Sequence, residues 1–151
     1  MSRPFSLQPL LELMQTRADD ASRALGKLIA AEQDAKARLV MLEQYRSEYA
    51  DQMRTATLQG LTPLALRNYQ DFLGRIDQAI NQQRSAVQQS AQQTLSGQEN
   101  WRQQNQRLKA IDTLSQRHDL RERHRENKQE QKLLDEFTTR RFSSMKPEYN
   151  D

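Results

Sequence analysis

A single short stretch, Gln59-Gly60-Leu61-Thr62-Pro63, decides the fold of this chain. Gly60 can adopt the left-handed backbone conformation that ends a helix. Thr62 can accept a hydrogen bond from a free amide at the start of the next helix, and Pro63 suits the first helical position. The stretch therefore predicts the end of one helix, a tight turn and the start of a second helix.

Long helices are expected on both sides of this turn. Pro63 is the only proline between residues 10 and 146, and the sequence around it is rich in residues that form helices well, such as Ala, Leu, Gln and Glu. We therefore expect one helix over about residues 7–58 and another over about residues 63–140. At about 1.5 Å per residue, they would be about 75 Å and 115 Å long.

An apolar seam with a period of about 3.5 residues runs through both predicted helices. In the first helix, 13 of the 15 seam positions from Leu7 to Ala56 are apolar, although only 35% of the chain is apolar. In the second helix, 9 of the 14 seam positions from Leu66 to Ile111 are apolar. Because a short turn makes the two helices antiparallel neighbours, the sequence predicts an all-α, left-handed coiled-coil hairpin.

The seam favours one register, in which the numbers of facing residues add up to 122. This register sets large residues against small ones, as a well-packed seam requires. The facing pairs include Ala21 with Trp101, Leu25 with Gly97, and Leu28 with Thr94. Because threonine is polar, we expect the last of these layers to pack loosely.

The expected hairpin divides the chain into three parts. Residues 1–6 are expected to form a flexible N-terminus, and residues 7–142 a single coiled-coil hairpin with its turn at about residues 59–63. The first helix has no residues left to pair beyond about residue 115, so the second helix should continue alone as an extended C-terminal helix. Residues 143–151 are expected to be disordered.

The composition excludes several classes of protein. The chain has 151 residues and no Cys, which removes disulfides, thiol nucleophiles and thiolate metal sites. Its mean hydropathy of −1.02 is low for a compact globule. No apolar run approaches the about 20 residues that a membrane span needs, and no signal peptide opens the chain. We therefore expect a cytosolic protein.

The sequence offers no chemistry of its own. His118 and His124 are six residues apart, so on a helix they point to opposite faces and cannot hold one metal ion together. A two-helix hairpin also lacks the concave pocket that catalysis needs. We therefore expect no enzyme activity, no cofactor and no bound metal.

The distal part of the second predicted helix is basic. Residues 101–125 carry seven Arg or Lys against three Asp or Glu. A solvated single helix, docking on an acidic protein surface and nucleic-acid binding are three readings of this charge. The interspersed acids would repel phosphates, and no row of aromatic residues accompanies the bases, so nucleic-acid binding is the weakest of the three.

Apolar and aromatic residues overflow the seam near the turn. In the predicted register they gather on one side of the hairpin. The residues are Leu42, Tyr45, Tyr49, Phe72, Ile76 and Ala79. Two interpretations remain open: ordinary cover for the core, or a surface that binds a partner.

Several segments resemble the FliJ family of flagellar export proteins. They are Ala24-Leu25-Gly26, Met41-Leu42-Glu43-Gln44-Tyr45-Arg46-Ser47-Glu48-Tyr49, Asn68-Tyr69-Gln70-Asp71-Phe72-Leu73, Ile76-Asp77-Gln78-Ala79-Ile80, Trp101-Arg102-Gln103-Gln104-Asn105-Gln106-Arg107-Leu108 and Glu130-Gln131-Lys132-Leu133-Leu134-Asp135-Glu136-Phe137. The resemblance extends over nearly the whole chain. Its most specific part is Tyr-x-x-x-Tyr in the first helix, followed by Asn-Tyr-Gln-x-Phe across the turn.

The resemblance implies a non-catalytic, stalk-like component of the flagellar type III export apparatus. Such a protein inserts into the hexameric ring of the export ATPase and promotes its assembly and activity. It also touches the cytoplasmic part of the export gate and escorts unloaded export chaperones. The resemblance further implies a cytoplasmic protein, peripherally associated with the inner membrane at the flagellar base, and we expect a monomer in isolation.

The resemblance also assigns site residues. The implied gate-binding surface consists of Arg38, Leu42, Tyr45, Tyr49, Phe72, Ile76, Ala79 and Gln83. We expect the single-helix extension to offer four basic residues to the ATPase ring, namely Arg117, Arg121, Arg123 and Arg125. Two other functions stay open: a structural coiled-coil adaptor that dimerises through its seam, and a basic helical protein that binds nucleic acid.

Overall fold

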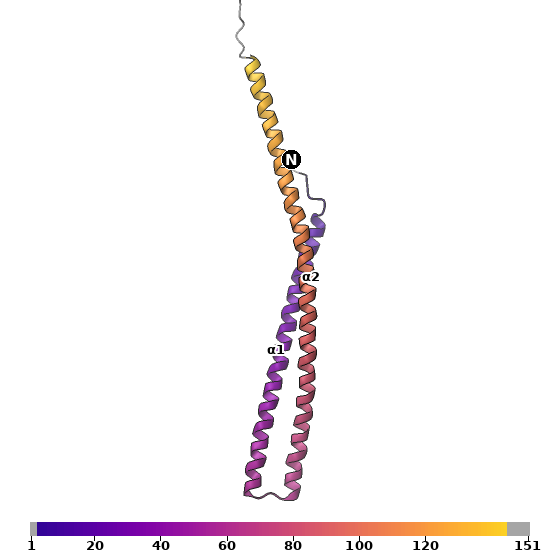
Figure 1. Cartoon of the computed structure of the whole chain (residues 1–151), viewed down its shortest axis with the longest axis vertical. Coiled ribbons are helices and arrows are strands. Elements are labelled where there is room, and N and C mark those ends of the chain that lie inside the picture. Colours follow the sequence, from indigo (N-terminus) through magenta and orange to yellow (C-terminus); the bar gives the residue numbers. More distant parts are fainter. Residues whose placement is uncertain (1–2, 145–151) are drawn as a thin grey trace, which may run out of the picture. The chain divides into compact units, whose positions relative to one another are not determined.

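The fold is an all-α hairpin, as the sequence predicts. The structure is a computed structural model that describes residues 3–144. In this range it contains two helices that pack against each other, α1 (Gln8–Gln59) and α2 (Pro63–Ser144) (Figure 1). Helix α2 ends two residues inside the segment 143–151 that was expected to be disordered. The rest of that segment lies outside the described residues, and so do residues 1 and 2.

The turn between the helices has the geometry that its sequence predicts. Gly60 has a φ of 97°, in the left-handed region, and its N–H donates to the carbonyl of Thr57 over 3.2 Å. The Thr62 side chain accepts a hydrogen bond from the N–H of Ala65, at 3.2 Å. Glycine and threonine therefore end one helix and cap the next through their own chemistry.

The described residues fall into two parts, each considered by itself. We call residues 18–103 the turn unit, because they contain the turn and the helix segments next to it. We call residues 3–17 and 104–144 the terminal unit.

The turn unit has a thin core. Its buried side chains are Ala18, Ala21, Ile76, Ile80 and Thr94, each 4–7% exposed. They come from seam positions of both helices, which run side by side and antiparallel (Figure 1). A hairpin of two helices needs only a narrow apolar stripe, which explains how a chain of low apolar content folds in this way.

Close packing in the turn unit confirms the predicted register. A Cβ atom placed on Gly97 would lie 2.6 Å from Cδ1 of Leu28 and 3.6 Å from Cδ1 of Leu25. Thr94 approaches Leu28 as well, because its hydroxyl lies 3.3 Å from the Leu28 carbonyl oxygen. Gly97 therefore permits the two helices to approach closely at this layer.

The Leu28–Thr94 layer is tighter than predicted. Thr94 is 6% exposed, so the expectation of loose packing is wrong for this residue. Its hydroxyl can donate to the carbonyl of Ser90, 3.1 Å away in the same helix, or to that of Leu28 in the other. This hydrogen bonding removes the cost of burying the polar group. Two layers further on, Ala21 is buried and Trp101 remains 38% exposed.

In the terminal unit the seam continues through α1 and α2. Met14 is buried, and its neighbours along the seam, Leu11, Leu108 and Ile111, are half-buried. Further along α2, residues 127–144 are exposed at every position. The sequence predicts a single-helix extension from about residue 115, whereas Arg3 still contacts His118 and Glu122 and the fully exposed stretch begins at residue 127. We call residues 127–144 the single-helix extension.

Residues before α1 lie against α2 within the terminal unit. The Arg3 N–H donates to the Glu122 carboxylate over 3.2 Å, and Nε2–H of His118 donates to the Arg3 carbonyl over 2.8 Å. The Phe5 ring lies 5.4 Å from the His118 ring, centroid to centroid. The Arg3 N–H bond lowers the pKa of Glu122. Phe5 and His118 have numbers that add up to 123, one more than the sum for the seam layers, so these contacts extend the pairing of the two helices beyond the start of α1.

Candidate functional site

Two edges flank the seam of the turn unit, and heptad notation separates them. Positions a and d form the seam, and positions e and g lie on either side of it. In α1, Leu42 is a d position, so Glu43 is e and Tyr45 is g. In α2, Ile76 is a d position, so Asp77 is e and Phe72 is g. The g positions of the two helices therefore line one edge, and the e positions line the other.

Aromatic rings from both helices cluster along the edge of the g positions, with Tyr45 and Phe72 at g positions and Tyr49 and Tyr69 at neighbouring d positions. The ring of Phe72 lies 4.6 Å from that of Tyr49 and 6.4 Å from that of Tyr45, and the latter pair is edge-to-face. Tyr49 also lies 5.3 Å from Tyr69. Tyr49 with Phe72 is a contact that the predicted register requires. We call the set that overflows the seam here the aromatic edge: Leu42, Tyr45, Tyr49, Phe72, Ile76 and Ala79.

The aromatic edge is open to solvent at its centre. Tyr45 is 46% exposed, and Phe72 and Tyr49 are half-buried. Edge-to-face packing holds Tyr45 against Phe72, so the ring is fixed in place although the helices do not cover it. An ordered, partly exposed aromatic cluster is typical of a surface that binds another protein.

The remaining residues of the implied gate surface differ in what they can contact. Arg38 is exposed, whereas Gln83 is half-buried and its side-chain amide donates to the Ala35 carbonyl over 2.9 Å. Ile76 is 5% exposed and belongs to the core. Leu42 and Ala79, like Gln83, are half-buried. All eight residues occupy d or g positions of the turn unit. Their role in gate binding stays a prediction.

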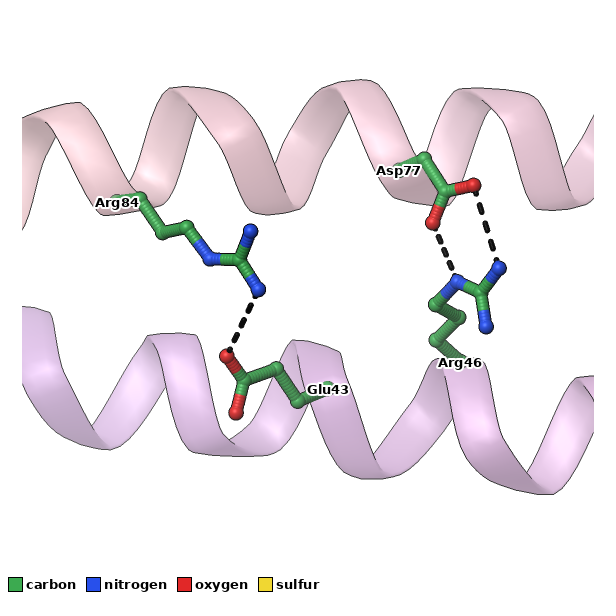
Figure 2. A network of polar contacts seen from close by, with 4 residues as sticks. All are labelled: Glu43, Arg46, Asp77 and Arg84. Atoms are coloured by element: carbon green, nitrogen blue, oxygen red, sulfur yellow. Dashed lines mark hydrogen bonds and ion pairs between the residues drawn. The ribbon is translucent and has the colours of Figure 1, made fainter.

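The opposite edge of the turn unit carries charged pairs instead of rings. The Arg46 guanidinium bonds both oxygens of the Asp77 carboxylate through Nε and Nη2 (Figure 2). Arg84 pairs with Glu43, with 3.6 Å between Nη2 and Oε1. We call these four residues the ionic edge. Three of them occupy e positions, and Arg46 reaches across from an a position.

The ion pair shifts the titration of its members. The hydrogen bond from Arg46 is the main cause that lowers the pKa of Asp77, and the positive charges of Arg46 and Arg84 act in the same direction. The same bond raises the pKa of Arg46. Both side chains are nearly half exposed, so solvent screens the interaction. The charges of the ionic edge are therefore paired within the chain and remain in contact with solvent.

Sequence reasoning did not find the ionic edge. Arg46 counted there as an interruption of the apolar seam. A usable signal is the sign of the charges at e positions, because Glu43 on one helix faces Arg84 on the other. Opposite charges at such positions predict interhelical pairs.

The arginines predicted to face the ATPase ring lie in the terminal unit. Arg117, Arg121 and Arg123 are exposed, whereas Arg125 is half-buried and pairs with Glu122, with 3.4 Å between Nη1 and Oε1. Arg117 and Arg121 are four residues apart and share one helix face. Arg123 points to another face, so the four residues do not form one patch.

Two further properties concern residues 3–144 only. In this range no helix holds an apolar stretch of the kind needed to traverse a bilayer. The same range holds no cluster of three or more His, Cys, Asp or Glu side chains arranged to bind a metal ion.

Comparisons with known proteins agree on one family. The family model described as Flagellar FliJ protein matches residues 2–146. The Flagellar FliJ protein of Salmonella typhi is 34% identical over 148 residues, which cover 98% of this chain and 100% of the relative. The Escherichia coli (strain K12) protein of the same name is 33% identical over 148 residues, with the same coverage.

A solved structure titled as that of a YscO homolog from Chlamydia trachomatis matches with a TM-score of 0.43 and 16% identity. It covers 97% of this chain and 100% of its own. We base nothing on a similarity of this size. The family match and the two relatives are sufficient: this chain belongs to the FliJ family and is a component of the flagellar type III export apparatus.

Proposed function

We propose that the protein links the hexameric export ATPase to the export gate, as a stalk-like activator without catalytic activity of its own. Members of the FliJ family are generally non-catalytic export components, and membership implies association with the export apparatus at the flagellar base. The finer roles proposed here concern three partners: the cytoplasmic part of the gate, the ATPase ring and the export chaperones.

The aromatic edge is the observation that carries the proposal for the gate. Tyr45 and Phe72 form an edge-to-face pair at the surface of the turn unit, with Tyr45 46% exposed. Large rings that are already held in place lose little conformational entropy on binding, so they serve as anchors for a partner. A partner that covers the pair would remove this apolar surface from water.

Buried members of the implied gate surface would support the contact rather than make it. Ile76 is 5% exposed, and the Gln83 side-chain amide donates a hydrogen bond to the Ala35 carbonyl. Both hold the two helices together beneath the rings. We therefore propose Tyr45, Phe72 and Tyr49 as the contacting residues, and Ile76 with Gln83 as positioning residues.

The single-helix extension supports the proposal for the ATPase ring. Every residue from 127 to 144 is exposed, and a long uncovered helix is a means of entering a central pore. The segment of α2 just before it is basic, with Arg117 and Arg121 on one face and Arg123 on another, and offers positive charge to the ring. Arg125 is partly neutralised by Glu122 and should contribute least.

Coupling between ring and gate then needs no chemistry in this chain. Two partners that bind different surfaces of one molecule can influence each other through it, provided that each binds one arrangement of the molecule better than another. We further propose that unloaded chaperones are escorted by the same protein while it is bound at the export apparatus.

Two other functions make different predictions. A structural adaptor that dimerises through its seam should sediment with twice the monomer mass, whereas the hairpin should sediment as a monomer. A nucleic-acid binder should hold random DNA with an affinity that falls steeply with salt. We favour the export role because the seam is already filled from within one chain, by residues such as Ile80 at 4% exposure.

The decisive experiment compares gate binding by two double variants of the full chain. Tyr45→Ala with Phe72→Ala removes the exposed ring pair, and we expect gate affinity to fall by at least about 100-fold, since two hot-spot rings are lost. Glu43→Ala with Arg84→Ala removes a pair on the ionic edge, at the same level of the hairpin, and should leave gate affinity within about threefold of the original.

Circular dichroism provides the control for folding, and both variants should keep the original helix content. Unchanged gate affinity after loss of the rings would overturn the proposal, and so would equal losses in the two variants. The proposal for the ring is tested separately, by the activity of the purified export ATPase with and without this protein, which should rise on addition.

A further inference from the structure

A second group of exposed apolar residues lies on the terminal unit. Four leucines there are 36–44% exposed, although they occupy seam positions or positions near the seam on the helix surface. We call them the leucine edge: Leu7, Leu10, Leu13 and Leu114. Leu10 and Leu114 occupy g positions, the same heptad positions that Tyr45 and Phe72 occupy in the turn unit. Apolar residues at g positions exceed what a two-helix seam can bury.

Basic residues border the leucine edge on the same heptad positions. Seven residues after Leu10 in α1 comes Arg17, and seven residues on either side of Leu114 in α2 come Arg107 and Arg121. All three arginines are exposed, and among the residues that the structure describes none has a carboxylate within ion-pairing distance. The edge therefore presents apolar surface between unneutralised positive charges.

Within residues 3–17 and 104–125 of the terminal unit, the acids stand at other positions. Glu12 is a b position, Asp112 and Asp119 are e positions, and Glu122 is an a position covered by its contacts to Arg3 and Arg125. None is a g position. In these two segments the charge is thus divided, because the g positions carry arginines and no acid.

The register makes this arrangement unfavourable for the isolated molecule. Arg17 and Arg107 are g positions whose numbers add up to 124, so they face each other across the edge, as Tyr45 and Ala79 do in the turn unit. Two like charges in facing positions repel. An external carboxylate placed between them would relieve the repulsion and form a bidentate pair with either guanidinium.

We propose that the leucine edge binds an amphipathic helix of another protein, whose apolar stripe is bordered by Asp or Glu. The stripe would lie on Leu10 and Leu114, and the acidic border would pair with Arg17 and Arg107. A helix suits the site because Leu7, directly before α1, and Leu10 and Leu13, in its first turns, are spaced by three and form a row that the i, i+4 and i+7 residues of a partner helix can cover.

Charge and apolar content together select this occupant over others. A second copy of this chain would bring its own arginines against those of the first, and like charges would repel. A nucleic acid would pair with the arginines but would leave the leucines against phosphates, without an apolar partner. Only an acidic amphipathic surface satisfies both parts of the edge.

The inference goes beyond the proposed function, because its main residues, Leu10, Leu114, Arg17 and Arg107, are required by neither the gate nor the ring proposal. Only Arg121, which borders the leucine edge, is shared with the ring proposal. Arg17 and Arg107 belong to neither set. A variant of these two arginines therefore tests the leucine edge alone, and the Tyr45→Ala and Phe72→Ala variant tests the gate alone.

The test uses the full chain and two labelled helical peptides of about 20 residues, a length that can hold a helix in water. Both carry the same leucine stripe, bordered by Glu in one and by Lys in the other. We expect the Glu peptide to bind, with an affinity that decreases as salt is added, and the Lys peptide not to bind. Fluorescence anisotropy measures both affinities.

Charge-reversed variants locate the binding. Arg17→Glu with Arg107→Glu should weaken binding of the Glu peptide at least about tenfold, which corresponds to ~1.4 kcal/mol. Lys109→Glu with Lys132→Glu changes the net charge equally at exposed sites away from the edge and should keep the affinity within about twofold. Arg17→Gln with Arg107→Gln, which introduces no new repulsion, should show a smaller loss in the same direction.

Two readouts complete the design. Leu10→Gln with Leu114→Gln should weaken binding at unchanged helix content, and Tyr45→Ala with Phe72→Ala should leave peptide binding unchanged. Equal losses in the two charge-reversed variants, equal binding of the two peptides, or dimers that disappear on the leucine substitutions would each overturn the inference. Tighter binding of random DNA than of the Glu peptide would overturn it as well.

Discussion

The aromatic edge and the ionic edge flank the same seam within the turn unit, yet they complete their contacts in different ways. On the ionic edge, Arg46 finds Asp77 and Arg84 finds Glu43, so each charge has its partner inside the chain (Figure 2). On the aromatic edge, Phe72 and Tyr45 pack on each other but leave Tyr45 46% exposed. The hairpin alone pairs the charges of the ionic edge, but it leaves apolar surface of the aromatic edge exposed to water.

This difference separates residues that hold the fold from residues that are available for a partner. Ion pairs across e positions help to set the register of the helices at little cost in exposed apolar area. Rings at g positions add apolar surface that two helices cannot bury. Substitutions on the two edges should therefore affect different measurements.

The largest effect on folding is expected at Ile76, the buried member of the aromatic edge, and not at its exposed ring. Ile76 is 5% exposed, so Ile76→Ala should lower the free energy of unfolding by about 2–4 kcal/mol. Tyr45→Ala, at a site that is 46% exposed, should lower it by less than about 1 kcal/mol. Urea unfolding followed by circular dichroism measures both, and a larger loss for Tyr45→Ala would show that the ring belongs to the core.

A smaller effect is expected for Tyr49, which packs on two rings. Its ring lies 4.6 Å from that of Phe72 and 5.3 Å from that of Tyr69. Tyr49→Leu keeps an apolar side chain and removes both ring contacts, which should cost about 1 kcal/mol of stability. Thermal unfolding with Tyr69→Leu as the companion variant tests this, because the two substitutions should not be additive.

On the ionic edge a double-mutant cycle should give a weak favourable coupling. Arg46→Ala, Asp77→Ala and the double variant remove the same interaction, and solvent screens it because both side chains are nearly half exposed. We expect the loss of stability to be much smaller than for Ile76→Ala, and to shrink further in high salt. Gate affinity should be unchanged in all three variants. A coupling that salt does not reduce would contradict a solvated ion pair.

The smallest effect is expected from pH. Arg46 lowers the pKa of Asp77 in the folded state, so the pair stabilises the protein at pH values above the pKa of an unfolded Asp, about 3.9. This contribution is lost as the pH falls through the lowered pKa of the folded state. The difference in melting temperature between the original protein and Asp77→Asn should therefore shrink on acidification from pH 7. A difference that grows on acidification would contradict this sign.

Much of the fold could be predicted because it depends on local chemistry and on a repeated period. Gly60 ends the first helix because glycine adopts the left-handed conformation easily, and Thr62 caps the second because its hydroxyl accepts a hydrogen bond from a free amide. The register followed from residue size, since Gly97 has no side chain and leaves room for Leu25 and Leu28 to approach the second helix. Tyr49 and Phe72 were placed together for the same reason.

What the sequence did not predict lacks such a period. The contacts of Arg3 and Phe5 with His118 involve residues before the first helix, where no repeat fixes which side chains meet. Thr94 packs closely because its hydroxyl can bond to backbone carbonyls on either helix, which a hydrophobic pattern does not encode. The apolar pattern treats Arg46 as a polar interruption of the seam, because its partner, Asp77, occupies an e position outside the seam.

The aromatic edge as a binding surface is tested most directly by photo-crosslinking in cells that assemble flagella. A photoreactive phenylalanine analogue placed at Tyr45 probes the aromatic edge, and the same analogue at Glu43, two residues away, probes the ionic edge. We expect a crosslink to the export gate from position 45 and none from position 43. Crosslinks of equal yield from both positions, or from position 43 alone, would contradict the assignment of the two edges.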